Sequence, residues 1–402
     1  MVVAQKNNVN TDRWPISPQI KGLKSSILRE ILKTSSQPGV ISFAGGLPAP
    51  ELFPLDDIKL AMDQAMTKYG GDTTQYSLTL GIPMLRELLA QRASARHTET
   101  AVENIIVTAG GQQALELVGR TFVTPGQYVL CEYPTYVGAL QVFNAYQAKY
   151  APVAMDHDGM IIDEVEEKIK KYRPTVIYTV SNFQNPTGIT LSLERRHALI
   201  ELATRYEIPI VDDNPYGDIR FAGDPIPTLK SIGGDAVIAV RTFSKTMAPG
   251  FRVGWLNGPK DIIPYFERAK QAIDLHTNTL NQYIIHEYVA AGKLEPHIEL
   301  IKSDYVVKRD LMMRSLNEFF PEGCTWTNPE GGLFLWVELP RHLSAKSLLP
   351  QAIERKVAYV YGEPFFPDGS GDHTLRLNFS NASHENIVEG IKRLGQLFTE
   401  NL

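Results

Sequence analysis

The feature that most constrains this chain is a repeated change of hydrophobic period between residues 104 and 258. Short apolar runs occur there between segments of helical periodicity: NIIVTAG, YVLCEYP, TVIYTVSN, IPIVDDNPY, AVIAVRTFS and RVGWLNG. Continuously apolar strands that alternate with helices are typical of a mostly parallel sheet covered on both faces. The sequence therefore predicts an α/β fold for this region.

The pattern changes after this region. A long helical stretch is predicted from residue 262 to about 291, and a further helix follows from about 295. Three later runs, FLWVELP, YVYGEPFF and LRLNFS, have the composition of strands. We therefore expect a smaller α+β domain after the larger α/β domain.

Charge and composition exclude several classes of protein. The net charge is −5 with acidic and basic residues mixed along 402 residues, so no nucleic-acid-binding or basic membrane-binding surface is predicted. No apolar run approaches the ~18 residues of a membrane-spanning helix, and the polar N-terminus lacks a signal-peptide pattern. Cys131 and Cys324 stand far apart without CxxC spacing, so we expect no metal site and a reducing, cytoplasmic location.

The segment from Thr242 to Gly254, TFSKTMAPGFRVG, carries the strongest chemical signal. Lys245 stands beside the hydroxyls of Thr242 and Ser244, and Arg252 follows. A lysine amine that binds an aldehyde, close to hydroxyl and guanidinium groups that bind phosphate, suits pyridoxal phosphate, because this cofactor carries both groups. For an isolated lysine, a solvated side chain in a loop is the alternative.

Two other strand ends carry polar residues. Asp213 and Tyr216 lie in DNPY, after the run IPIVD, and Asn185 begins NPTG, after TVIYTVSN. A carboxylate that faces the pyridine nitrogen keeps the ring protonated, and a phenol or an amide can hydrogen-bond the ring oxygen. Both motifs are also typical of simple turns. Their position after strands, where open α/β sheets bind ligands, favours a functional interpretation.

Further positions are compatible with the same site. Gly111 and Gln112 lie in TAGGQQ, where a strand meets a helix whose first N–H groups can approach a phosphate, although a plain turn is the alternative. Tyr136, after the next strand, can stack on the ring or belong to the core. Arg376, in LRLNFS, needs an anionic partner, either a structural carboxylate or that of a substrate.

These motifs resemble those of the fold-type-I aminotransferases of class I and II, over roughly residues 25 to 400. The resemblance implies a large domain with a mostly parallel, seven-stranded sheet between helices, and a smaller α+β domain. It implies that Lys245 forms the Schiff base with pyridoxal phosphate and that Arg376 binds the substrate carboxylate. It also implies that Asp213 pairs with the pyridine nitrogen, that Asn185 and Tyr216 contact the ring oxygen, and that Tyr136 stacks on the ring. The residues implied to hold the phosphate are Gly111, Gln112, Thr242, Ser244 and Arg252.

The resemblance also implies a division of the chain. Residues 1–24 form a flexible N-terminal segment, and residues 25–55 pack with the small domain and the active site. Residues 56–293 form the large cofactor-binding domain, and residues 294–402 form the small C-terminal domain.

Four segments are similar to one branch of the family, which contains 2-aminoadipate, kynurenine and broad-range aromatic or branched-chain aminotransferases: SSILREILK, ISFAGGLPAPELFP, TQYSLTLGIPMLRE and GGLFLWVELP. In that branch the tyrosine that matches Tyr76 reaches the phosphate of the neighbouring subunit's cofactor, and the glycine that matches Gly46 lies beside the substrate. A homodimer with shared active sites is therefore implied. Tyr361 departs from the usual Val-Pro-Gly of the branch, which leaves the substrate open.

The resemblance implies transfer of an amino group from an L-amino acid to a 2-oxo acid, with 2-oxoglutarate as the expected acceptor, by a ping-pong mechanism. A lyase or decarboxylase with the same cofactor remains an alternative, because the sequence does not show which substrate bond is aligned for cleavage. A non-catalytic, ligand-sensing regulator is the second alternative. The ~25 residues before the family-like region are too few, and not basic enough, for the helix-turn-helix unit that such a regulator needs.

Overall fold

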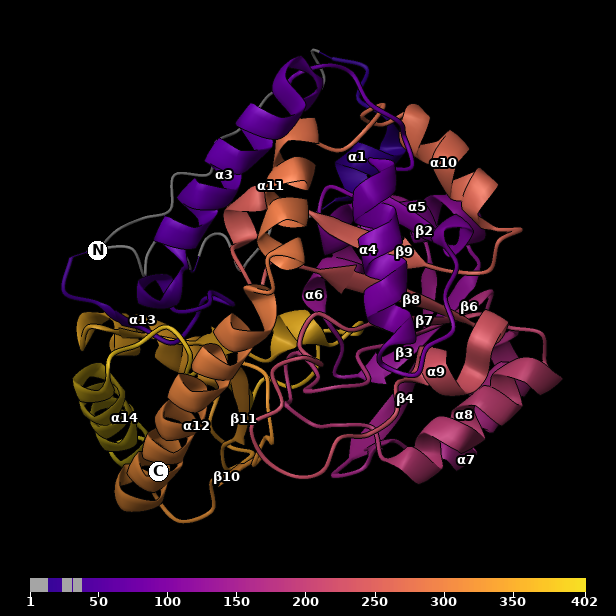
Figure 1. The fold of residues 1–402 in the computed structure, drawn as a ribbon. Coiled ribbons are helices and arrows are strands. Elements are labelled where there is room, and N and C mark those ends of the chain that lie inside the picture. The colour runs from indigo at the N-terminus through magenta and orange to yellow at the C-terminus, as the bar shows by residue number, and fades with distance from the viewer. Residues whose placement is uncertain (1–13, 24–30, 32–37) are drawn as a thin grey trace.

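The computed structural model describes residues 14–23, 31 and 38–402, and its centre is an eight-stranded sheet (Figure 1). The strand order is β2-β9-β8-β7-β6-β3-β4-β5. The strands are β2 (Ile105–Thr108), β3 (Tyr128–Tyr133), β4 (Lys149–Asp156), β5 (Gly159–Met160), β6 (Val176–Thr179), β7 (Ile210–Asp213), β8 (Val237–Thr242) and β9 (Gly254–Asn257).

The predicted α/β fold with a mostly parallel sheet is confirmed. Strands β4, β3, β6, β7 and β8 pair in parallel, whereas β9 runs antiparallel between β8 and β2, and β5 runs antiparallel to β4. All residues of β6 and β7 are buried, as their continuous apolar sequence predicts. The sequence did not mark β4, because it contains Pro152 and buries only alternate residues near the sheet edge.

Helices cover both faces of this sheet. On one face Val129 and Cys131 of β3 belong to the same core as residues of α5 (Gly111–Phe122) and α6 (Val137–Ala145). On the other face Leu130 packs with α7 (Ile162–Tyr172), α8 (Leu193–Arg205) and α9 (Leu229–Gly233). Successive strand residues point to opposite faces, which explains why one strand contributes to both cores.

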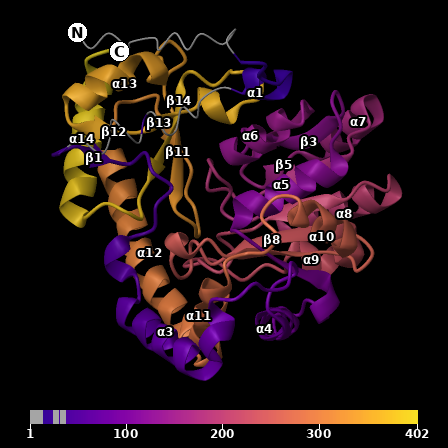
Figure 2. The same cartoon turned by 90° about the horizontal axis from the view of Figure 1, so that it is seen from above.

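A smaller antiparallel sheet has the order β10-β11-β14-β13 and stands apart from the large sheet (Figure 2). Its strands are β10 (Thr325–Trp326), β11 (Phe334–Glu338), β13 (Val360–Tyr361) and β14 (Thr374–Asn378). The helices of this part are α12 (Leu294–Phe319), α13 (Ala345–Glu354) and α14 (His384–Thr399). Strand β1 (Ile41–Ser42) pairs in parallel with β12 (Val357–Ala358), which joins the N-terminal region to this smaller part.

The helical stretch predicted from residue 262 to 291 is divided in the structure. Helix α10 (Ile263–Gln271) ends before Leu275, whose φ of 65° is incompatible with a continuing right-handed helix. Helix α11 (Thr279–Ala290) then begins at Asn278, whose side chain accepts a hydrogen bond from the Asn281 amide. The turn between them therefore interrupts a stretch of helical periodicity.

The N-terminal region is described in part. Helix α1 (Pro18–Gly22) precedes the predicted helix SSILREILK, which lies outside the described residues except for the buried, helical Ile31. Helices α3 (Leu55–Tyr69) and α4 (Pro83–Ser94) follow in the N-terminal half of the chain. None of the helices in the described part of the chain has the length and apolar character needed to cross a membrane. The domain boundaries given above stay predictions.

Gly254, at the start of β9, gives a direct test of this packing. A Cβ atom there would lie 2.6 Å from the Arg241 carbonyl oxygen and 2.9 Å from the Gly110 carbonyl carbon. Because both are backbone atoms, one in β8 and one at the start of α5, we expect Gly254→Ala to lower the free energy of unfolding by about 2 kcal/mol in chemical denaturation. Gly250→Ala is the control, since no heavy atom lies within 4 Å of its added Cβ. Equal stability of the two variants would contradict this packing argument.

Candidate active site

The candidate site lies at the carboxyl ends of the parallel strands, where open α/β sheets bind ligands. Asp213 ends β7 and Thr242 ends β8, while Asn185 follows β6 and Tyr136 follows β3. Arg376 reaches the same place from β14 of the smaller sheet, where its side chain hydrogen-bonds Asn185. Parallel pairing thus brings together residues that are far apart in the chain.

Lys245 follows β8, and its Nζ atom donates a hydrogen bond of 2.6 Å to the carbonyl oxygen of Gly46. Burial, with added repulsion from the guanidinium groups of Arg376 and Arg252, lowers the pKa of the Lys245 amine to about 8. No carboxylate among the described residues forms an ion pair with Lys245. The amine is therefore partly neutral near pH 8, as a nucleophile or a general base must be.

Asp213 is buried at the end of β7, and the Tyr178 hydroxyl donates a hydrogen bond of 2.9 Å to its Oδ2 atom. Burial raises the pKa of Asp213 to about 7, with Tyr178 acting in the opposite direction and Asp212 adding to the rise. No lysine or arginine of the described residues pairs with this carboxylate. A cationic ring N–H is the type of partner that would favour its ionised form.

Hydroxyl, amide and guanidinium groups gather around Ser244. The Thr242 hydroxyl donates to Ser244 Oγ at 2.8 Å, and the Ser244 amide donates to Thr242 Oγ1 at 3.1 Å. Arg252 has a left-handed backbone with φ of 52°, and its Nη1 atom lies 3.4 Å from Ser244 Oγ. A Cβ atom on Gly110 would lie 2.6 Å from Arg252 Nη2, so a glycine is needed where the arginine crosses the start of α5.

Of the aromatic residues of the site, Tyr216 is buried and Tyr136 is partly buried. Tyr136 precedes α6, and a Cβ atom on Gly138 would lie 2.5 Å from its Cζ atom, so the Tyr136 ring covers this glycine. Burial, with repulsion from Asp213, raises the pKa of Tyr136 to about 12. Burial also raises the pKa of Tyr216, and Asn185 beside it acts in the opposite direction. Both phenols therefore remain protonated donors at neutral pH.

Arg376 is buried without an ion pair to any described carboxylate. Its Nη1 atom donates to Asn185 Oδ1 at 2.8 Å, and its Nη2 atom donates to the Ala44 carbonyl oxygen at 2.7 Å. Its guanidinium carbon lies 4.2 Å from the ring centroid of Phe334, and its Nε atom has no hydrogen-bond partner in the described structure. Burial lowers the pKa of Arg376 to about 10, and such a cation is favourable only beside an anion.

The structure brings together all the predicted site residues except Tyr76. Gly111 begins α5 near Arg252, and Gln112 donates from Nε2 to the Gly138 carbonyl oxygen at 3.2 Å. Tyr76 is 79 % exposed, and its ring meets the His276 ring edge-on at 5.8 Å between centroids.

Sequence reasoning missed Tyr178 and Gly110. A tyrosine in the buried run TVIYTVSN could have been noticed, because its hydroxyl needs a partner in the core. Gly110 belongs to the TAGGQQ motif, but its close approach to Arg252 joins two segments that are far apart in the chain.

The residues present fit pyridoxal phosphate. Lys245 and Arg252 offer an amine and a guanidinium group without carboxylate partners in the described structure, and the buried Asp213 lacks a cation. These are the counterparts of an aldehyde, a phosphate and a pyridine nitrogen, respectively. The fold and the site together define a lysine-dependent transferase for this cofactor.

Comparison with known proteins agrees with this class. Residues 40–394 match the family model described as aminotransferase class I and II, so the chain belongs to this family. The aromatic-amino-acid aminotransferase 1 of Thermococcus litoralis is 42 % identical over 393 residues, which cover 96 % of this chain and 94 % of the relative. The protein is therefore an aminotransferase.

Two solved structures bear on the cofactor. The kynurenine aminotransferase of Pyrococcus horikoshii, in complex with PMP, is 42 % identical with a TM-score of 0.94 and coverage of 98 % of this chain and 99 % of that chain. The α-aminoadipate aminotransferase LysN of Thermus thermophilus, with bound N-(5'-phosphopyridoxyl)-L-leucine, is 35 % identical with a TM-score of 0.90, covering 96 % and 97 %. Pyridoxal phosphate is the cofactor of this enzyme.

Tyr178 offers a test of the electrostatics around Asp213. Its hydroxyl stabilises the ionised carboxylate, so Tyr178→Phe removes a charge-assisted hydrogen bond and raises the pKa of Asp213 further. We expect the Kd of pyridoxal phosphate, measured by fluorescence titration at pH 7.5, to rise about tenfold. The matched control is Tyr359→Phe, which removes a buried hydroxyl bonded to the Ala345 carbonyl in the smaller part. An equal change in both variants would sink this interpretation.

Proposed function

We propose that this aminotransferase takes the amino group from an L-amino acid with an aromatic, branched-chain or 2-aminoadipate-like side chain. The amino group goes to a 2-oxo acid, 2-oxoglutarate, by a ping-pong mechanism. The observation that carries this proposal is the position of Lys245. Its amine lies next to the Gly46 carbonyl and has a pKa lowered to about 8 by burial and two guanidinium groups.

Lys245 is the proposed catalytic residue. Pyridoxal phosphate supplies an aldehyde that condenses with amines and a protonated ring that withdraws electrons from the substrate Cα. The substrate amine takes the place of the Lys245 amine on the cofactor. The freed Lys245 amine then removes the proton from the substrate Cα and later gives a proton to the imine carbon of the cofactor. A pKa near the working pH suits both roles.

The other predicted residues are proposed to position the cofactor. The groups around Ser244 support contacts to the phosphate, and the buried carboxylate of Asp213 supports a contact to the pyridine nitrogen. Asp213 holds the ring nitrogen, Asn185 and Tyr216 hold the ring oxygen, Tyr136 covers the ring, and Gly111, Gln112, Thr242, Ser244 and Arg252 hold the phosphate.

Arg376 is proposed to bind the α-carboxylate of the substrate. The Nε atom of Arg376 has no partner in the described structure, and the Asn185 side chain lies next to Nη1. This arrangement favours a bidentate contact between the guanidinium group and a carboxylate. Gly46 is proposed to lie beside the substrate, because its carbonyl oxygen accepts a hydrogen bond from the Lys245 amine. Arg376 therefore fixes one end of the amino acid relative to Lys245.

The proposed substrate class depends on aromatic side chains near Arg376. The ring centroids of Phe365 and Trp336 are 5.8 Å apart, and the ring of Phe365 also lies 5.2 Å from the Arg376 guanidinium. Phe366 extends this aromatic cluster, since its ring centroid lies 6.3 Å from that of Trp336 and 4.7 Å from that of Tyr133, and Tyr361 belongs to the same hydrophobic core. Apolar walls favour aromatic and branched side chains. The substrates for which the relatives are named, aromatic amino acids, α-aminoadipate and kynurenine, support the same range.

We also propose a homodimer in which Tyr76 contributes to the partner's site. Tyr76 is 79 % exposed. Large apolar side chains that are 43 to 67 % exposed stand on α3 and on the segments that flank it in sequence: Leu47, Leu55, Leu60, Met62, Met66 and Leu78. Apolar patches of this kind favour an interface between subunits.

The test of the proposed reaction is a half-reaction of the purified enzyme without any 2-oxo acid. Amino acids are added singly. The cofactor is followed by its absorbance, and the products are identified by mass spectrometry. We expect tyrosine, phenylalanine, leucine, kynurenine or 2-aminoadipate to give one equivalent of 2-oxo acid and pyridoxamine phosphate. Lys245→Ala should lower this rate by at least about 10⁴-fold, because it removes both the amine and the base. Release of carbon dioxide or ammonia would instead indicate a lyase.

The proposed dimer is tested by mixing inactive subunits. Lys245→Ala and Tyr76→Ala subunits are unfolded, mixed and refolded together. If Tyr76 serves the partner's site, each hybrid dimer contains one site with both native residues, so activity returns to about a quarter of the native value at equal mixing. A mixture of Lys245→Ala subunits with subunits carrying both changes is the control, and it should stay inactive. Failure of the first mixture to regain activity would contradict shared sites.

A further inference from the structure

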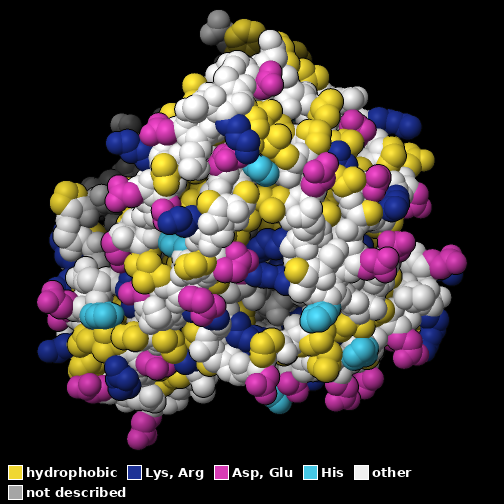
Figure 3. Space-filling model, in the orientation of Figure 1, with side chains coloured by type: hydrophobic (Ala, Val, Ile, Leu, Met, Phe, Trp, Pro, Cys, Tyr) yellow, Lys and Arg dark blue, Asp and Glu magenta, His cyan; other side chains and the backbone are white. Residues whose placement is uncertain are grey.

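A second cavity, with a volume of about 680 Å³, lies outside the proposed active site. It is bounded by α4, by α12, by residues 214–228 and by the sheet surface around Arg241. Figure 3 shows Lys and Arg side chains gathered at a hollow near the middle of this face. Lys245, Arg252 and Arg376 do not line the cavity, whereas Thr242 of the proposed phosphate site does. The cavity therefore adjoins the proposed cofactor site without containing its lysine or its two arginines.

Several residues that line this cavity carry a buried polar atom that lacks a partner. Asn214 and Asn257 are 2 % and 5 % exposed, and neither Asn214 Nδ2 nor Asn257 Oδ1 has a hydrogen-bond partner within the described structure. Arg220 donates from Nη1 to Glu330, but its buried Nη2 atom has no partner there. Buried polar atoms are rarely left unpaired, and unpaired ones point to a bound molecule or to ordered water.

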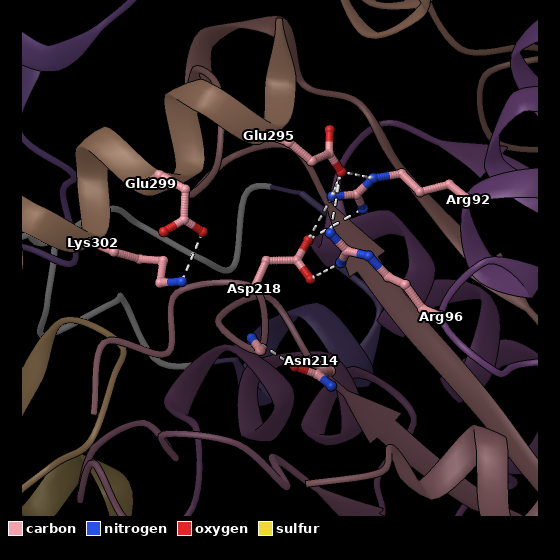
Figure 4. A network of polar contacts seen from close by, with 8 residues as sticks. Arg92, Arg96, Asn214, Asp218, Glu295, Glu299 and Lys302 are labelled. Atoms are coloured by element: carbon pink, nitrogen blue, oxygen red, sulfur yellow. Dashed lines mark hydrogen bonds and ion pairs between the residues drawn. The ribbon is translucent and has the colours of Figure 1, made fainter. Parts of the chain in front are cut away.

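Arg241 provides the strongest indication of what binds. It lies on β8, one residue before Thr242, and no described residue accepts a hydrogen bond from its guanidinium group. Neighbouring cations are already paired, since Arg92 of α4 and Arg96 in the turn after it contact Asp218 and Glu295 (Figure 4). Arg241 thus adds a positive charge to the cavity wall and forms no ion pair within the described residues, although it is close enough to Asp218 to help lower the pKa of that carboxyl.

The electrostatic balance of the wall is positive. Six cations line the cavity, Arg92, Arg96, Arg220, Lys230, Arg241 and Lys302, against three carboxylates, Asp218, Glu295 and Glu299. Two carboxylates outside the lining, Glu330 and Asp235, pair with Arg220 and Lys230, so the excess is a single positive charge. Burial alone favours the neutral form of Asp218, but the surrounding arginines outweigh it and lower the pKa of Asp218 to about 2. A positive potential in a partly enclosed, low-dielectric space attracts anions.

We propose that this cavity binds a small organic dianion, with Arg241 and the free Nη2 atom of Arg220 contacting its two acidic groups. Guanidinium groups match the geometry of carboxylates and bind them through paired hydrogen bonds. Asn214 Nδ2 and Asn257 Oδ1 add a neutral donor and a neutral acceptor for the rest of the molecule. This inference does not depend on which amino acid the enzyme uses.

The cavity shares one chain segment with the proposed active site. Asn214 follows Asp213 directly, and its Oδ1 atom accepts a hydrogen bond of 2.9 Å from the Gly217 amide (Figure 4). Asp218 ends the same segment and carries the contacts to Arg92 and Arg96. A ligand in the cavity therefore contacts the segment that carries Asp213 and Tyr216.

The test is isothermal titration of glutarate into the holoenzyme at low ionic strength. To keep glutarate out of the active site, the enzyme first carries N-(5'-phosphopyridoxyl)-L-leucine. We expect one glutarate per subunit, and a Kd at least about tenfold weaker for Arg241→Gln, which loses a charge-assisted contact. Butyrate, with one carboxylate, should also bind at least about tenfold more weakly than glutarate.

Two further variants keep the test decisive. Arg268→Gln removes the same charge from α10, where Arg268 lies over Tyr265 away from the cavity, and it should bind glutarate with native affinity. Arg220→Gln is the second cavity variant and is titrated alongside, so that the test holds even if the melting curve shows that Arg241→Gln does not fold. Native affinity in both cavity variants, equal weakening in Arg268→Gln, or no binding to the native enzyme would overturn the proposal.

Discussion

The parallel pairing of β3, β6, β7 and β8 is the constraint on which the rest of the structure depends. Parallel strands all end at the same edge of the sheet, so the segments that follow them meet there. Asp213, Thr242, Asn185 and the turn before α6 are therefore neighbours, although they come from distant parts of the chain. Burial of these strands on both faces keeps their register, because a slip would expose apolar side chains.

Unpaired charge is the second property that follows from this arrangement. Lys245, Arg252 and Arg376 lie at the sheet edge without carboxylate partners in the described structure, and Asp213 is buried without a cation. Each of these groups is costly to bury alone, and each becomes favourable beside a complementary group of the cofactor or the substrate. The direction of the pKa shifts expresses the same cost, since burial favours the neutral form of both Lys245 and Asp213.

Much of this could be predicted from the sequence, because the signals were local. Helices α3, α4, α5 and α8 and the central strands follow from hydrophobic period, and the motif around Lys245 identified the cofactor before any contact was known. The sequence did not reveal β4, whose proline and half-exposed face weaken the strand pattern, or the turn at Leu275, which interrupts a helical period. Tyr178 was missed because its role depends on a neighbouring strand.

The sequence by itself determined the fold class, the cofactor and the type of residue at each predicted position, because these depend on periodicity and on short motifs. Only the tertiary structure decided how the residues meet. The contact between Lys245 and Gly46, the approach of Arg376 from the smaller sheet to Asn185, and the second cavity beside Arg241 each join segments separated by many residues. Such contacts are set by the packing of whole elements, and no local pattern encodes them.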